Sequence, residues 1–218
     1  SRWHDHLLCI LKPDLAVRGA QGFEQHTWVV EVTRVAKGSP ATLDIALRYR
    51  RPVAMVEVDY ESQGGLLPVD ASGVLLPPHD FTAEEAIKYP RITSDYTGPS
   101  GSIGTPWGDE RVAGAAQIAA LLIEHWDSLG LYRIVAIPSH QPESISPTNY
   151  QLHTRGEFIV HWGHAPSREA AGEVLAEQKV VKLLRYAQAN GQLDQTAEKE
   201  VDLRNVSELS SRATDSVR

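Results

Sequence analysis

The histidines are the residues best suited to metal chemistry, and the chain has nine of them. His4 and His6 form one close pair, and His161 and His164 form another. Positions i and i+2 of a strand share a face, so His4 and His6 could chelate an ion together. A zinc site needs at least three protein ligands, and no third ligand stands at a suitable spacing from either pair. We therefore expect surface or partly buried histidines, with no metal and no other cofactor.

The sequence also lacks signatures of nucleophilic and phosphate chemistry. Cys9 lies in the apolar run Leu-Leu-Cys-Ile-Leu, which favours a buried thiol over a reactive one. The glycine-rich stretch 98–108 has neither the lysine nor the preceding strand of a phosphate-binding loop. Helix dipoles account for the acidic pairs Glu84-Glu85 and Asp109-Glu110, which stand at expected helix starts. We expect no enzymatic activity; a histidine-dependent metalloenzyme stays open, and bound zinc or iron in the purified protein would favour it.

Composition and charge narrow the class of protein. The 218 residues are 42% apolar, typical of a globular chain, and the net charge of −7 disfavours binding to nucleic acid or to an anionic membrane surface. A single cysteine excludes an intrachain disulfide. The longest charge-free apolar stretch, Val112 to Ile123, is too short to cross a bilayer. Because the sequence starts at Ser1 and its only methionine is Met55, we expect that the natural start has been removed.

The first fifty residues have the pattern of a small β-α-β-β unit. An apolar run from Leu7 to Leu11 precedes a weak helical stretch that begins at Lys12. Strands are expected from Trp28 to Val35 and from Leu43 to Tyr49, joined by a turn. The pattern breaks at Arg51 and Pro52, because proline cannot donate to a strand ladder. We expect these two residues to form the hinge to a second domain.

The second domain is expected to combine short strands with two main helices. The patterns predict strands at 53–59, 66–69, 74–76 and 131–137, a short helix at 81–88 capped by Thr82, a loop over 97–108, and a hairpin of 150–152 with 158–162. The first main helix begins at Asp109-Glu110, ends at Gly130 and has a buried face of Ile118, Leu121, Leu122, Trp126 and Leu129. The second buries Ala176, Val180, Leu183, Leu184 and Ala187, turns Lys179, Lys182 and Arg185 outward, and ends at Asn190-Gly191.

The last strand is the best candidate for a binding surface. Residues 199–206 alternate apolar and charged positions, and a polar tail, 207–218, that is expected to be disordered follows them. Such a strand is expected at or near a sheet edge, where unpaired main-chain groups can accept another chain. We expect Leu203→Pro to weaken binding of a partner strand. The alternative is that Glu200, Asp202 and Arg204 only solvate an outer face.

The order of several segments resembles a known family. His26-Thr27-Trp28-Val29, the alternating residues 41–49 and Arg51-Pro52-Val53-Ala54 are followed by Val69-Asp70-Ala71-Ser72-Gly73-Val74 and the Gly98-Pro99 loop. Next come the helix and strand within 110–138 and the segment Phe158-Ile159-Val160-His161-Trp162-Gly163. The last two pieces are the helix around Lys179 and the segment Glu200-Val201-Asp202-Leu203-Arg204. Together they span residues 25–206 and are similar to the FtsQ/DivIB family of bacterial cell-division proteins.

This resemblance implies a fold, a location and partners. It implies an α+β protein with a POTRA-like (polypeptide-transport-associated) domain at 1–51 and a β domain at 52–206 built on a mostly antiparallel sheet. The family resemblance further implies a non-enzymatic divisome scaffold on the periplasmic side of the bacterial inner membrane, anchored only by a helix upstream of Ser1 and monomeric when isolated. FtsB/FtsL-type coiled-coil proteins would bind by strand addition at Val201, Asp202, Leu203, Arg204, Asn205 and Val206. The alternative is a POTRA-containing secretion or outer-membrane assembly module, which tandem repeats of the unit would favour.

Overall fold

The computed structural model describes residues 22–38, 42–60, 63–94, 98–137, 148–196 and 198–205. The chain divides into two compact units, Ser1–Arg51 and Pro52–Arg218. This boundary falls at the proline junction, where the expected hinge lies; a hinge motion there stays a prediction. The expected first strand at 7–11, the start of the following helix and Cys9 lie outside the described residues.

The described part of the first unit consists of helical residues at 22–24, a turn and an antiparallel hairpin. Strand β1 (Val29–Gly38) pairs with β2 (Thr42–Tyr49), and their register places Val29 opposite Tyr49. Alternate side chains of β2 are half-buried, as the alternation of Leu43, Ile45 and Leu47 predicts, while the residues between them are exposed. Both strands of the predicted hairpin are therefore confirmed, with β1 extending three residues further than expected.

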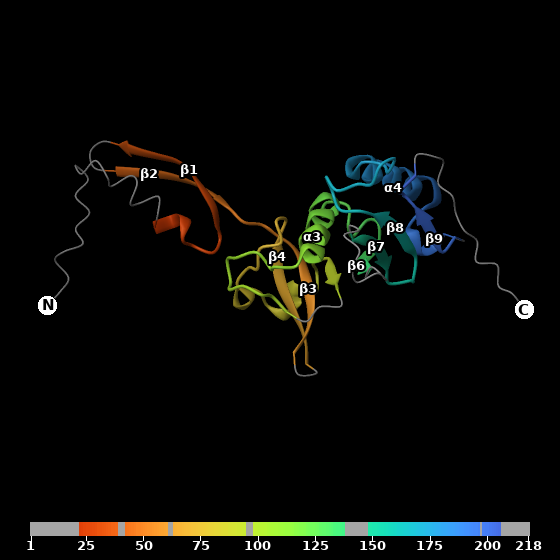
Figure 1. Cartoon of the computed structure of the whole chain (residues 1–218), viewed down its shortest axis with the longest axis horizontal. Helices are drawn as coiled ribbons and strands as arrows, with labels where there is room; N and C mark the ends of the chain where they lie inside the picture. Colours follow the sequence, from red (N-terminus) through yellow and green to blue (C-terminus); the bar gives the residue numbers. More distant parts are fainter. Residues whose placement is uncertain are drawn as a thin grey trace, which may run out of the picture. The chain divides into compact units, whose positions relative to one another are not determined.

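The second unit is built on a seven-stranded mixed sheet (Figure 1). Its strands are β3 (Pro52–Tyr60), β4 (Gln63–Asp70), β5 (Arg91–Thr93), β6 (Leu131–Ile137), β7 (Asn149–Thr154), β8 (Ile159–Gly163) and β9 (Glu200–Asp202). Their order across the sheet is β4-β3-β5-β6-β7-β8-β9. The longer ladders, β3 with β4, β6 with β7 and β7 with β8, are antiparallel. Strand β5 pairs in parallel with β3 and β6, and β9 pairs in parallel with β8. The predicted α+β class is confirmed.

Two helices pack on one face of this sheet. Helix α3 (Glu110–Leu122) contacts β3, β5 and β6, and α4 (Ala176–Asn190) lies at the β8–β9 end (Figure 1). Asp109 caps α3 by accepting a hydrogen bond from the Arg111 amide at 2.8 Å. Beyond α3, the chain continues in turns to Gly130, whose positive φ of 69° suits glycine. The residues of both predicted faces pack on the core, including Trp126 and Leu129, which follow α3, but Leu121, Val180, Leu184 and Ala187 are only half-buried.

Short elements surround the sheet. A 3-10 turn, η1 (Pro78–Asp80), precedes helix α2 (Ala83–Ala86), and η2 (Leu193–Gln195) precedes β9. Thr82 is the N-cap of α2, as predicted, and it forms a reciprocal capping box with Glu85; α2 is shorter than the expected 81–88. Val74 and Leu75 form isolated bridges instead of the strand expected at 74–76.

The sequence patterns do not predict strand β5, the third strand of the sheet. It has only three residues, Arg91–Thr93, of which Ile92 alone is fully buried. Three residues are too few to display an alternating pattern, and the preceding Pro90 favours a loop interpretation. Pairing with β3 on one side and β6 on the other holds these residues in a strand, although their own sequence has no strand pattern.

The strand registers separate the two faces of the sheet. Ile92, Ile134, Leu152, Val160 and Val201 stand in one cross-strand row, and all five side chains are fully buried under the helices. The next row contains Arg91, Arg133, His153, Ile159 and Glu200, and these side chains are half-buried on the opposite face. The second face has a polar character that the helix-covered face lacks.

Candidate functional site

Strand β9 ends the seven-stranded sheet and contains two of the predicted binding residues, Val201 and Asp202, while the others follow it in the chain. Val201 and Leu203 point into the core and are fully buried, so their side chains cannot contact a partner directly. Asp202 is half-buried, and Arg204 and Asn205 are exposed. The strand is shorter than the expected 199–206, and Val206 lies outside the described residues.

The main-chain groups of this segment alternate between β8 and the open edge. The Leu203 amide donates to the carbonyl of His161 at 3.1 Å, and the Ile159 amide donates to the carbonyl of Lys199 at 2.9 Å. Residues 199 and 203 therefore face β8. Val201, between them, faces β8 as well, because in a parallel ladder every second residue bonds to the same neighbour. The amides and carbonyls of Glu200 and Asp202 therefore point to the open edge.

This geometry corrects the prediction for Leu203→Pro. The Leu203 amide already bonds to β8 inside the sheet, so proline there would break an internal hydrogen bond. A loss of partner binding in that variant would report damage to the sheet. Glu200 is the better position to test, because its amide faces the open edge.

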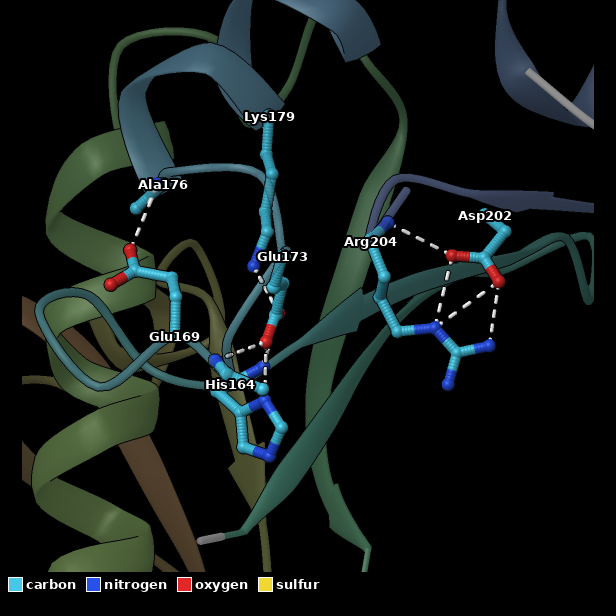
Figure 2. Close-up of polar contacts among 8 residues, drawn as sticks. His164, Glu169, Glu173, Ala176, Lys179, Asp202 and Arg204 are labelled. Atoms are coloured by element: carbon cyan, nitrogen blue, oxygen red, sulfur yellow. Dashed lines mark hydrogen bonds and ion pairs between the residues drawn. The ribbon is translucent and has the colours of Figure 1, made fainter. Parts of the chain in front are cut away.

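The exit from β9 is closed by local contacts. Arg204 bonds to Asp202 through both its amide, at 2.9 Å, and its guanidinium, at 2.6 Å (Figure 2). The Arg204 carbonyl accepts from the Val174 amide at 3.0 Å, and Lys182 donates to the Asn205 carbonyl at 2.5 Å. Burial disfavours the charged form of Asp202, but the bonds from Arg204 outweigh burial and lower its pKa. The available edge is therefore limited to the Glu200–Asp202 segment.

A buried charged cluster lies beside this exit. Glu173, in the loop before α4, accepts from Lys179 at 2.6 Å, from the His164 amide at 2.9 Å and from the Ala170 amide at 2.9 Å (Figure 2). The imidazole Nδ1 of His164 also bonds to Glu173. Gly163 makes room for this carboxylate, since a β-carbon there would overlap Glu173 Oε1.

The prediction that Lys179 points outward was wrong. Its side chain is fully buried, and its ammonium lies 5.3 Å from the centroid of the Trp162 ring. Lys179 stands three residues after Ala176 and four before Leu183, so helical spacing puts it on the buried face. A lysine is normally expected on the exposed face of a helix, so its charge favoured the wrong prediction. The counterion, Glu173, belongs to a loop whose path the sequence does not reveal.

The cluster has no free oxygen lone pair for chemistry. A carboxylate offers about four acceptor sites, and Glu173 uses each oxygen twice. Burial alone would raise the Glu173 pKa, but the bonds from Lys179, Ala170 and His164 outweigh burial and lower it to about 2. Glu173 therefore stays ionised at neutral pH and fastens the start of α4 to the end of β8.

His161 and His164, the second close pair in the sequence, bind separate carboxylates. His161 contacts Glu200 at 2.9 Å, whereas His164 contacts Glu173. Within the described residues, no group of three or more histidine, cysteine, aspartate or glutamate side chains is placed to hold a metal ion. His4 and His6 lie outside that part of the chain.

Comparisons with known proteins add no family assignment. No family model matches the chain, and no curated protein matches it. Among the residues with a described position, no helix combines the length and the apolar character needed to cross a membrane.

Proposed function

We propose that the protein is a non-enzymatic, FtsQ-like scaffold of the bacterial divisome on the extracytoplasmic side of the inner membrane. It recruits FtsB/FtsL-type partners by adding their strand to β9. The support is the order of segments over residues 25–206 together with an α+β domain that ends in a strand at the sheet edge. The open main-chain groups of Glu200 and Asp202 are the observation that carries the proposal.

Side chains set the specificity of this edge. Glu200 contacts the imidazole of His161, and Asp202 pairs with the guanidinium of Arg204, so the edge has a patterned charge. Charged side chains on an edge strand deter indiscriminate pairing. A partner strand with complementary charges gains main-chain hydrogen bonds without electrostatic repulsion, whereas other strands are repelled. This difference in binding free energy makes the edge specific for its partner.

The test replaces one main-chain donor at the open edge. Glu200→Pro removes the outward amide, and edge positions whose amide faces solvent tolerate proline. We expect about tenfold weaker binding of a peptide from the carboxyl-terminal extracytoplasmic segment of an FtsB-type protein, measured by titration calorimetry. Glu200→Ala is the matched control, since it loses the same side chain and keeps the amide.

Two outcomes would overturn the proposal. One is a wild-type protein that does not bind the peptide. The other is a Glu200→Pro variant that binds as tightly as Glu200→Ala while its circular dichroism spectrum matches the wild type, because strand addition at this edge depends on the lost donor.

A further inference from the structure

The face of the sheet opposite α3 and α4 contains a cleft of about 480 Å³. Residues of β5, β6, β7 and β8 and of the turn between β7 and β8 form its walls. Val135 and Ile159 give it an apolar floor, while Tyr132, Arg133 and Arg155 contribute an aromatic ring and two guanidiniums, and Glu157 contributes one carboxylate. A cleft that combines an apolar floor with a few convergent polar groups is the usual form of a binding site.

Tyr132 is the centre around which the cations gather. The guanidinium carbons of Arg155, Arg133 and Arg91 lie 4.1, 4.8 and 5.1 Å from the centroid of its ring. The β6–β7 ladder has an irregularity between Leu131 and Arg133, and the two consecutive residues Tyr132 and Arg133 both line the cleft. A regular strand would turn one of them to the opposite face.

The positive charges at this ring are only partly neutralised. Arg91 pairs with Glu57 at 3.1 Å, but its buried Nε has no hydrogen-bond partner. Arg133 and Arg155 form no ion pair with an acidic side chain in the described parts of the chain. Three guanidiniums around one ring repel one another, and a bound anion would relieve that repulsion.

We propose that this cleft binds the carboxylates of an acidic peptide segment from a protein partner. Guanidinium groups present paired donors that match a carboxylate in bidentate geometry. Tyr132 holds Arg133 and Arg155 over its ring, which reduces the side-chain entropy that each would lose on binding. The apolar floor receives the methylene groups of glutamate side chains. This surface uses residues other than the β9 edge and extends the proposed function.

The charge of the whole chain favours a short acidic segment over nucleic acid. The net charge of −7 repels a long polyanion, whose affinity depends on many phosphate contacts. A few carboxylates need only the local field of the cleft, where neither Arg133 nor Arg155 forms an ion pair with another described residue, the lining Glu157 included.

The experiment measures fluorescence anisotropy of labelled hexaglutamate with the full chain. We expect saturable binding that Arg133→Gln with Arg155→Gln weakens about tenfold or more, because two charge-assisted contacts are lost. Arg185→Gln, on the exposed face of α4, is the matched control and leaves the affinity unchanged. Arg133→Lys with Arg155→Lys keeps the charge but loses the paired donors, and its affinity falls between the two.

Further measurements distinguish between possible ligands and separate the proposed cleft from the proposed β9 edge. Equal affinity of the wild type and the double glutamine variant overturns the proposal, as does displacement of hexaglutamate by equimolar inorganic phosphate or tighter binding of a DNA duplex. Unchanged hexaglutamate binding by Glu200→Pro supports a site apart from β9. Loss of that binding in a folded Glu200→Pro variant would assign the peptide to the edge and overturn the cleft.

Discussion

Single residues show how the second unit places charge in its interior. Removing one member of a buried ion pair usually costs about 3–5 kcal/mol, because the remaining charge is left without a partner. Lys179 and Glu173 satisfy each other, and the Ala170 and His164 amides complete the carboxylate's hydrogen bonds. The pair fixes the loop before α4, through which Val174 holds the exit of β9.

The low pKa of Glu173 predicts a pH-dependent stability. A carboxyl group whose pKa falls from 4.5 to about 2 on folding stabilises the fold fully above pH 4.5 and loses this contribution as the pH falls through 2. We expect the difference in unfolding free energy between wild type and Glu173→Gln to shrink by about 3 kcal/mol over that range. Urea titrations at several pH values measure it; a constant difference would contradict the assigned pKa.

At the scale of elements, one close approach sets how α3 sits on the sheet. Gly114 of α3 faces Tyr150 of β7, whose hydroxyl donates to the Arg111 carbonyl at 3.1 Å. A β-carbon at position 114 would overlap that hydroxyl. Glycine therefore stands inside a helix, where it is normally unfavourable, because only glycine lets the strand side chain reach the helix backbone.

Gly114→Ala is expected to destabilise the second unit by about 1–3 kcal/mol, although alanine is the better helix former. The added methyl must displace Tyr150, which is almost fully buried. Tyr150→Phe in the same chain removes the overlapping oxygen and restores part of the loss. Gln117→Ala, at an exposed position of the same helix, is the control for helix propensity. A higher urea midpoint for Gly114→Ala than for the wild type would refute this packing.

At the scale of the whole molecule, the two units differ in how much apolar core they contribute. Every member of the main apolar cluster lies between Val53 and Leu203, within the second unit. Apart from helical residues at 22–24, the described part of the first unit is a two-stranded hairpin, an element that is at most marginally stable in isolation. The second unit therefore contains its own core.

A chain truncated to residues 52–218 is accordingly expected to fold without the first unit. Its thermal midpoint should lie within about 2 °C of the main transition of the full chain, because no member of the apolar cluster is removed. Differential scanning calorimetry measures both midpoints. A truncated chain that fails to fold, or melts far below the full chain, would show that the division into independent units is wrong.

Local patterns in the sequence determined most elements of this fold. Hydrophobic periodicity located α3, α4, β6 and the β7–β8 hairpin, and Thr82 and Asp109 marked helix starts, because capping and amphipathic spacing act over a few residues. The alternation in residues 199–206 likewise indicated the strand on which the proposed function rests.

Long-range pairing decided the rest. Only the sheet order places β5 between β3 and β6 and β9 at the end, and only the register turns the Leu203 amide inward and the Glu200 amide outward. The counterion of Lys179 and the cations around Tyr132 come from separate elements that folding brings together. Such contacts depend on how distant segments pack, and no local pattern of residues encodes that packing by itself.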